Sequence, residues 1–202
     1  YMGGAGYDTG HDIAVDTTGN IYISGRSDYG DFPTTSNAFD TTYGGGHSIH
    51  NMGDGFVAKL PSDGSHLIYS TYLGGEQADS PSAMVVDANG SVIVTGYTKS
   101  EGFPSTPGAY DTSCGTDVGC DETSSNLGDG GPSVIFVTII APSGGYLLYS
   151  TFVGSSGVEG GNSIVLNDDG SVYVVGNTGS TSFPTTINAV DRYYNGDTDS
   201  FL

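Results

Sequence analysis

The feature that most constrains the fold of this chain is an internal repeat with offsets of 71 and 80 residues. The segment 15–25 recurs at 86–96 and again at 166–176, each time as a polar turn followed by an apolar stretch that ends in Gly. Phe-Pro dipeptides recur with the same two offsets, at Phe32-Pro33, Phe103-Pro104 and Phe183-Pro184. Because separate motifs share one register, the chain is predicted to contain tandem copies of one structural unit.

Each unit has the pattern of four β-strands. Segments 12–15 and 21–24 are typical of a hairpin, since a turn rich in Asp, Asn and Gly joins them. A long polar connection follows Phe-Pro and leads to a third strand at 55–60 and a fourth at 67–73, with counterparts at 134–140 and 146–153. We therefore predict an all-β fold of four-stranded antiparallel, propeller-like units at about 3–75, 76–154 and 155–202, the third unit being incomplete.

The composition agrees with such a fold and excludes several partners. Among 202 residues there are 34 Gly, 23 acidic and only 4 basic side chains, which gives a formal charge of −19. So few cations cannot follow a phosphate backbone, so nucleic acid is excluded as a partner, and an anionic membrane surface would repel the chain. No apolar run approaches the roughly 18 residues that cross a bilayer, so no membrane insertion is expected.

The motifs resemble a known family. Segments 16–25, 32–35, 54–60 and 67–75 together are similar to the seven-bladed β-propeller repeat family of bacterial extracellular proteins. The resemblance implies a propeller fold and an extracellular or cell-surface location, and it implies no catalytic residues. The second unit departs from the pattern, because Ile139 stands where the first unit has Lys59 and a long insertion precedes its third strand.

The number of units predicts an incomplete array. Tyr1 lies within a fourth-strand motif and Leu202 within a third-strand motif, and about three blades are fewer than the 4 to 8 of ordinary closed propellers. We expect completion by further chain or by a neighbouring subunit. Unpaired strand edges favour addition of another copy, and head-to-tail addition that does not close gives a fibre.

Acidic loops provide candidate calcium ligands. An Asn-x-Gly-Asp element precedes the third strand at 51–54 and 126–129, and the third unit has alternating oxygen donors at 195–199. Calcium takes about 6 to 8 oxygen ligands from such loops, while the same residues are also typical of Asx turns that lead into a strand. Both interpretations stay open for the candidates Asp54, Asp129, Asn195, Asp197 and Asp199.

Two covalent features are expected in the second unit. Cys114 and Cys120 flank a short loop, which favours a local disulfide in a chain of extracellular type. Asn89 begins an Asn-Gly-Ser sequon at a hairpin turn that should be exposed, so it is a candidate for N-glycosylation.

These observations favour a structural or adhesive extracellular module, associating with identical subunits and stiffened by calcium. One alternative is a propeller that binds carbohydrate or protein through loops at one end of its channel, with glycans as partners. A propeller lyase or hydrolase is less favoured, because no catalytic motif is present. An enzyme would show one asymmetric pocket that holds carboxylates with shifted pKa values.

Overall fold

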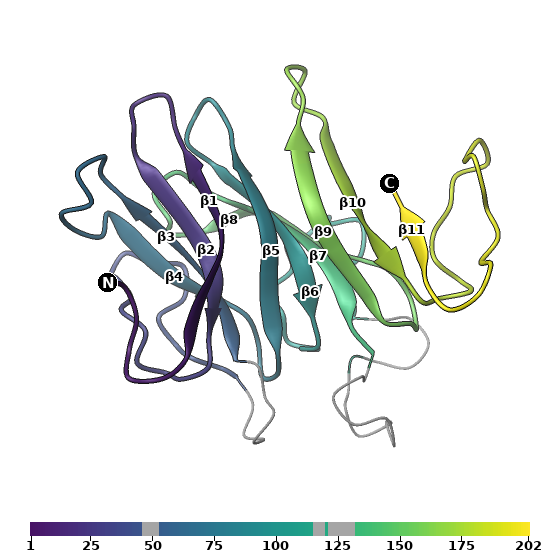
Figure 1. Ribbon diagram of the computed structural model, residues 1–202, viewed down its shortest axis with the longest axis horizontal. Helices are drawn as coiled ribbons and strands as arrows, with labels where there is room; N and C mark the ends of the chain where they lie inside the picture. Colours follow the sequence, from purple (N-terminus) through teal and green to yellow (C-terminus); the bar gives the residue numbers. More distant parts are fainter. Residues whose placement is uncertain (46–52, 115–119, 121–131) are drawn as a thin grey trace.

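The computed structural model describes residues 1–45, 53–114, 120 and 132–202, and in this part of the chain the regular secondary structure is entirely β. The strands form three antiparallel sheets that follow one another along the long axis of the molecule (Figure 1). We call these sheets blades 1, 2 and 3 in chain order. The predicted all-β fold of repeated antiparallel, propeller-like units is confirmed.

The strands of each blade are hydrogen-bonded in sequence order. Blade 1 consists of β1 (Asp8–Val15), β2 (Ile21–Ser27), β3 (Asp54–Leu60) and β4 (Tyr69–Leu73). Blade 2 consists of β5 (Asp79–Val86), β6 (Val92–Thr98), β7 (Val134–Ile140) and β8 (Leu147–Val153). Blade 3, as far as it is described, consists of β9 (Glu159–Leu166), β10 (Val172–Thr178) and β11 (Asp199–Phe201). Because β1 contacts β5 and β5 contacts β9, the first strands of the three blades lie next to one another.

The first strand of blade 1 is longer than the sequence pattern predicts. The predicted segment 12–15 is the second half of β1, which has a β-bulge between Gly10 and Asp12, and β5 has the same bulge between Pro81 and Ala83. A bulge breaks the two-residue alternation from which the hairpin was located. Opposite the bulge the backbones come so close that a methyl group on Gly25 or Gly96 would lie 2.0 Å from a carbonyl oxygen, so only glycine fits there.

Apolar side chains fill the seams between blades. In the seam between blades 1 and 2, buried residues of both sheets form one cluster that includes Tyr22, Val57, Tyr69, Met84, Val92 and Val94. In the seam between blades 2 and 3, Ala83 and Ile93 pack near Ile164. Each fully buried side chain of this size contributes about 1.5–3 kcal/mol, so stacking of blades is a main source of stability.

The repeated Phe-Pro motifs serve packing within each blade. The motif ring lies on an aromatic ring of the third strand, with centroid distances of 4.0 Å for Phe32–Phe56 and 4.6 Å for Phe103–Phe136. In blade 3 the corresponding pair is Phe183–Phe201 at 4.8 Å. The rings of blades 1 and 2 are buried core residues, whereas Phe183 and Phe201 are half-buried.

The predicted disulfide is confirmed. Cys114 and Cys120 are bonded, with their Cα atoms 5.7 Å apart. Both are buried in the same cluster as Phe103 and Phe136, so the crosslink ties the insertion to the core of blade 2. In the described residues no helix is long and apolar enough to span a bilayer.

Candidate functional site

The N-terminal end of the row of blades is an open sheet face. Pairing of β1 with β2 places four apolar side chains on the side of blade 1 that points away from blade 2, and we call them the head face. Ile13 is 65% exposed and Val15 is similarly exposed, while the other two are half-buried. The head face consists of Ile13, Val15, Ile21 and Ile23.

The C-terminal end carries a second open face. Pairing of β9 with β10 places Ser163 opposite Val175 and Val165 opposite Tyr173, on the side of blade 3 that points away from blade 2. Val165 is 59% exposed, and the other three are exposed as well. We call Ser163, Val165, Tyr173 and Val175 the tail face.

Inside the molecule the counterparts of both faces are covered. The repeat offset of 71 residues relates the head face to Met84, Val86, Val92 and Val94 of blade 2. There Val94 is 0% exposed, because blade 1 lies over it. The tail face corresponds to Ala83, Val85, Ile93 and Thr95, where Ile93 is 3% exposed under blade 3. In both internal seams, the counterpart of the tail face on one blade thus packs against the counterpart of the head face on the next blade.

A carboxylate holds the turn that leads into each blade. Asp8, Asp79 and Glu159 are the first residues of β1, β5 and β9, and the repeat offsets relate all three. Each accepts a hydrogen bond from the backbone N–H four residues earlier, at 2.7 Å from Gly4, 2.8 Å from Gly75 and 2.8 Å from Ser155. These carboxylates were not among the residues that the sequence motifs singled out.

The carboxylate of Asp79 is the most completely surrounded of the three. It is fully buried and accepts further hydrogen bonds from the hydroxyls of Thr98 and Ser100, the latter at 2.9 Å. Burial raises the pKa of Asp79 to about 7, although the three donors oppose the shift. Glu159 repeats this arrangement, with its pKa raised by burial and a hydrogen bond of 3.0 Å from Thr178.

Asp54 is a second buried carboxylate, next to Asp79 in the seam between blades 1 and 2. It begins β3, is 1% exposed and accepts the backbone N–H of Gly44 at 2.7 Å, while its Oδ1 has no hydrogen-bond partner among the described residues. Burial raises its pKa to about 7, and the nearby charge of Asp40 adds to the shift. A methyl group on Gly74 would meet Asp79 Oδ2 at 2.8 Å and Asp54 Cγ at 2.9 Å, so the two carboxyl groups are neighbours.

The candidate calcium ligands are spread over separate places. Asp54 lies in the buried seam, and Asp129 lies outside the described residues. Asn195 and Asp197 lie in the loop before β11, and Asp199 is the first residue of that strand. In the described part of the chain no group of three or more His, Cys, Asp and Glu side chains is arranged to hold a metal ion. Calcium binding at these residues stays a prediction.

In the loop before β11 the polar groups bond to one another. The backbone N–H of Asn195 donates to Asp199 Oδ2 at 2.8 Å, and its side-chain amide donates to Asp191 Oδ2 at 3.1 Å. Asp197 has a φ of 61°, and its carbonyl oxygen accepts the hydroxyl of Tyr194. Asp199 therefore closes the connection before β11 as Asp54 closes the one before β3.

The candidate glycosylation site lies at the expected kind of position. Asn89 is exposed in the turn between β5 and β6, and its backbone N–H donates to Asp87 Oδ1 at 2.8 Å. Gly90 follows with a φ of 85°. The side chain of Asn89 is accessible, and its modification stays a prediction.

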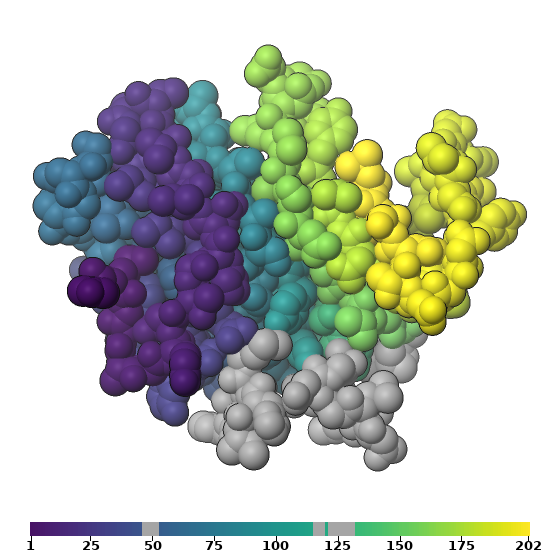
Figure 2. Space-filling view, in the orientation of Figure 1, coloured from purple at the N-terminus to yellow at the C-terminus, as the bar shows by residue number. Residues whose placement is uncertain are grey.

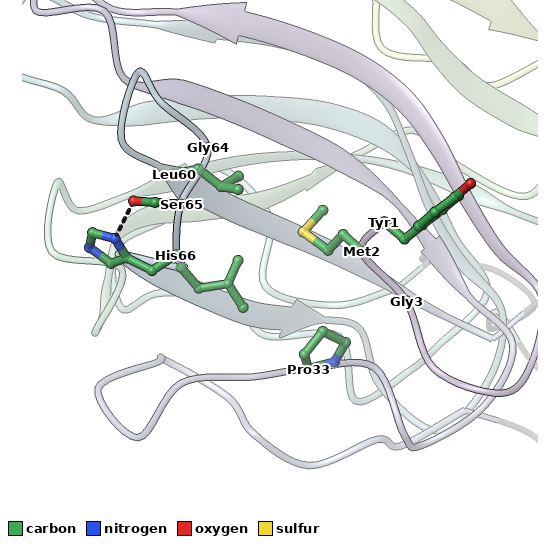
Figure 3. A pocket seen from close by; sticks show the side chains of 9 residues that line it. Tyr1, Met2, Gly3, Pro33, Leu60, Gly64, Ser65 and His66 are labelled. Atoms are coloured by element: carbon green, nitrogen blue, oxygen red, sulfur yellow. Dashed lines mark hydrogen bonds between the residues drawn. The ribbon is translucent and has the colours of Figure 1, made fainter.

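A pocket of about 230 Å³ adjoins the head face (Figure 3). It lies between the N-terminal segment and the turn that joins β3 to β4. No carboxylate lines it, and the buried Asp54 and Asp79 are elsewhere, so the pocket does not coincide with the carboxylates of raised pKa. The lining residues are Tyr1, Met2, Gly3, Pro33, Leu60, Gly64, Ser65, His66 and Leu67.

Residues 1–33 and 68–104 match the family described as Beta-propeller repeat. The first segment contains β1 and β2, and the second contains β4, β5 and β6. Each begins within a fourth-strand motif and ends at Phe-Pro, so the two matches share the register of the internal repeat. In these segments the chain is similar to β-propeller repeats. No curated protein matches the chain.

Proposed function

We propose that this chain is a structural or adhesive module of the extracellular space or cell surface, and that it associates head-to-tail with identical subunits into a fibre. One observation carries the proposal: the head and tail faces are open, while their counterparts meet in the internal seams. In the fibre, the tail face of one molecule covers the head face of the next. Such heterologous contacts extend into filaments when the rotation between subunits does not close a ring.

The chemistry of the faces supports this use. Apolar side chains at Ile13, Val15, Val165 and Tyr173 remain in contact with solvent, and soluble monomers rarely leave large contiguous patches of this kind uncovered. The formal charge of −19 makes the subunits repel each other. Added salt screens that repulsion, so association is expected to strengthen from low to physiological ionic strength.

The proposed location rests on other features. A buried disulfide is typical of proteins that fold in oxidising compartments. The excess of acidic side chains keeps an exposed, loop-rich surface hydrated. Both agree with a module that works outside the cell.

Sedimentation velocity over a concentration series tests the proposal. We expect the average mass of the wild-type chain to rise with concentration, and Ile13→Asp to weaken association at least about tenfold, since burying an unpaired charge costs well over 1.4 kcal/mol. The control is Leu148→Asp, because Leu148 is also exposed, on β8, but belongs to neither face. A wild-type chain that stays monomeric at high concentration in physiological salt would overturn the proposal.

A further inference from the structure

The connection after Phe-Pro does more than join strands, because in blade 1 it docks on the next blade. The backbone N–H of Phe39 donates to the carbonyl oxygen of Gly144 at 2.7 Å. Beside it, the side-chain amide of Asn37 donates to the carbonyl oxygen of Ser143 at 3.4 Å. Gly144 lies so close to the buried ring of Tyr69 that a methyl group there would meet Cγ at 2.2 Å. The turn between β7 and β8 is thus held by the connection and by an aromatic ring of blade 1.

The head end has the same turn without its cover. Gly64 is the counterpart of Gly144, with a φ of 64° against 73°. A methyl group on Gly64 would meet no described atom within 4 Å. The turn between β3 and β4 therefore has the same conformation as the turn between β7 and β8, but no described segment packs on it.

The tail end has the same connection without its turn. Segment 188–191 is the counterpart of 37–40 in the repeat register, and Val190 is fully exposed where Phe39 is half-buried. The local fold is nevertheless the same, since Ala189 N–H donates to Thr186 at 3.1 Å as Ala38 N–H donates to Thr35 at 3.0 Å. A preformed segment loses little conformational freedom on docking. Figures 1 and 2 show this connection standing out at the C-terminal end, opposite the β3–β4 turn.

The pocket beside Gly64 corresponds to a space that side chains of blade 1 fill in the seam between blades 1 and 2. Its lining residues Leu60 and Leu67 correspond to Ile140 and Leu147, which belong to the cluster around Tyr69. At the head end the described residues leave that space open, and Figure 3 shows the ring of Tyr1 pointing away from Ser65 and His66. Leu60 and Leu67, next to the uncovered turn, can therefore pack against apolar side chains of another molecule.

We propose that segment 187–190 of one molecule docks on the turn 62–65 of a second copy of this chain. The Val190 N–H donates to the carbonyl oxygen of Gly64, and the Asn188 side chain donates to that of Asp63, as their counterparts do in the internal seam. The inference rests on the proposed head-to-tail association and names its polar contact. Asp63 stands where blade 2 has Ser143, so this contact adds to the salt dependence of association.

Cysteine crosslinking tests the contact. Asn188→Cys and Asp63→Cys are made in separate molecules, mixed and exposed to a mild oxidant, with the native disulfide left intact. The matched control is the double variant Asn37→Cys and Ser143→Cys, which places the same pair within one molecule. We expect the mixture to give a crosslinked heterodimer at least about tenfold faster than either variant alone, since docking raises the effective concentration of the two thiols.

The outcomes separate this inference from the function on which it rests. If the mixture assembles by sedimentation and the internal control forms its crosslink, but no heterodimer appears, the docking contact is wrong and head-to-tail association stands. If nothing assembles, both are wrong. Equal crosslinking of each variant with itself would also overturn the contact, because it would show random encounters.

Discussion

Replacing Asp79 with alanine is expected to lower the free energy of unfolding by about 3–5 kcal/mol, because three buried hydrogen-bond donors lose their acceptor. The substitution leaves the Gly75 N–H and the hydroxyls of Thr98 and Ser100 without their acceptor in a seam that water does not reach. Each unsatisfied buried donor costs about 1–3 kcal/mol. Urea unfolding followed by circular dichroism measures the loss.

The repeat supplies graded controls for this substitution. Asp8→Ala removes the counterpart of Asp79 in blade 1, where the carboxylate is only half-buried, so we expect a smaller loss. Asp63→Ala removes an exposed carboxylate that, among the described residues, accepts a hydrogen bond within its own turn, at 3.0 Å from the Ser65 N–H. It should change stability by less than about 1 kcal/mol. Similar losses for all three variants would show that the buried carboxylate has no special part in the seam.

Stability is also expected to fall as the pH rises from 5 to 8. Asp54 and Asp79 have pKa values of about 7 in the folded chain against 3.8 for the free side chain. Between these pH values the folded chain binds more protons than the unfolded chain. Protonation of the two carboxylates therefore stabilises the fold fully below about pH 4, and this stabilisation is lost as the pH passes 7. A tenfold difference in proton affinity between the folded and unfolded chain corresponds to about 1.4 kcal/mol, so thermal unfolding over this pH range should show a loss of several kcal/mol.

Two variants assign the pH effect. Asp54→Asn keeps the shape and removes the charge, so it should raise stability at pH 8 and flatten the profile. Histidines change charge in the same interval, and His11 Nδ1 lies 2.6 Å from the carbonyl oxygen of Pro81 in this seam. His11→Gln is therefore the control, and it should retain the fall. A stability that rises from pH 5 to 8 would contradict the account.

The sequence predicted the elements better than their boundaries. The hairpin tips and third strands follow from repetition at fixed offsets, because the core needs the same side chain at the same place in every blade. The beginnings of β1 and β5 could not be predicted, because the bulges at Gly10 and Pro81 interrupt the alternation of apolar and polar residues.

The buried carboxylates and the open faces were harder to predict for a different reason. Asp8, Asp79 and Glu159 share the repeat register, but each stands in a different local sequence, and burial of a carboxylate depends on the neighbouring blade. Similarly, Ile13 and Met84 are both apolar residues of an inner strand. Only the order of the blades decides that the first is exposed and the second is covered.

The most direct test of head-to-tail association is sedimentation of two complementary variants, alone and mixed. Ile13→Asp blocks the head face and Val165→Asp blocks the tail face, so each variant alone should be monomeric. In a mixture, the free tail of the first can cover the free head of the second, and we expect a species of twice the monomer mass and nothing larger. A mixture that stays monomeric, or either variant pairing with itself, would contradict the account.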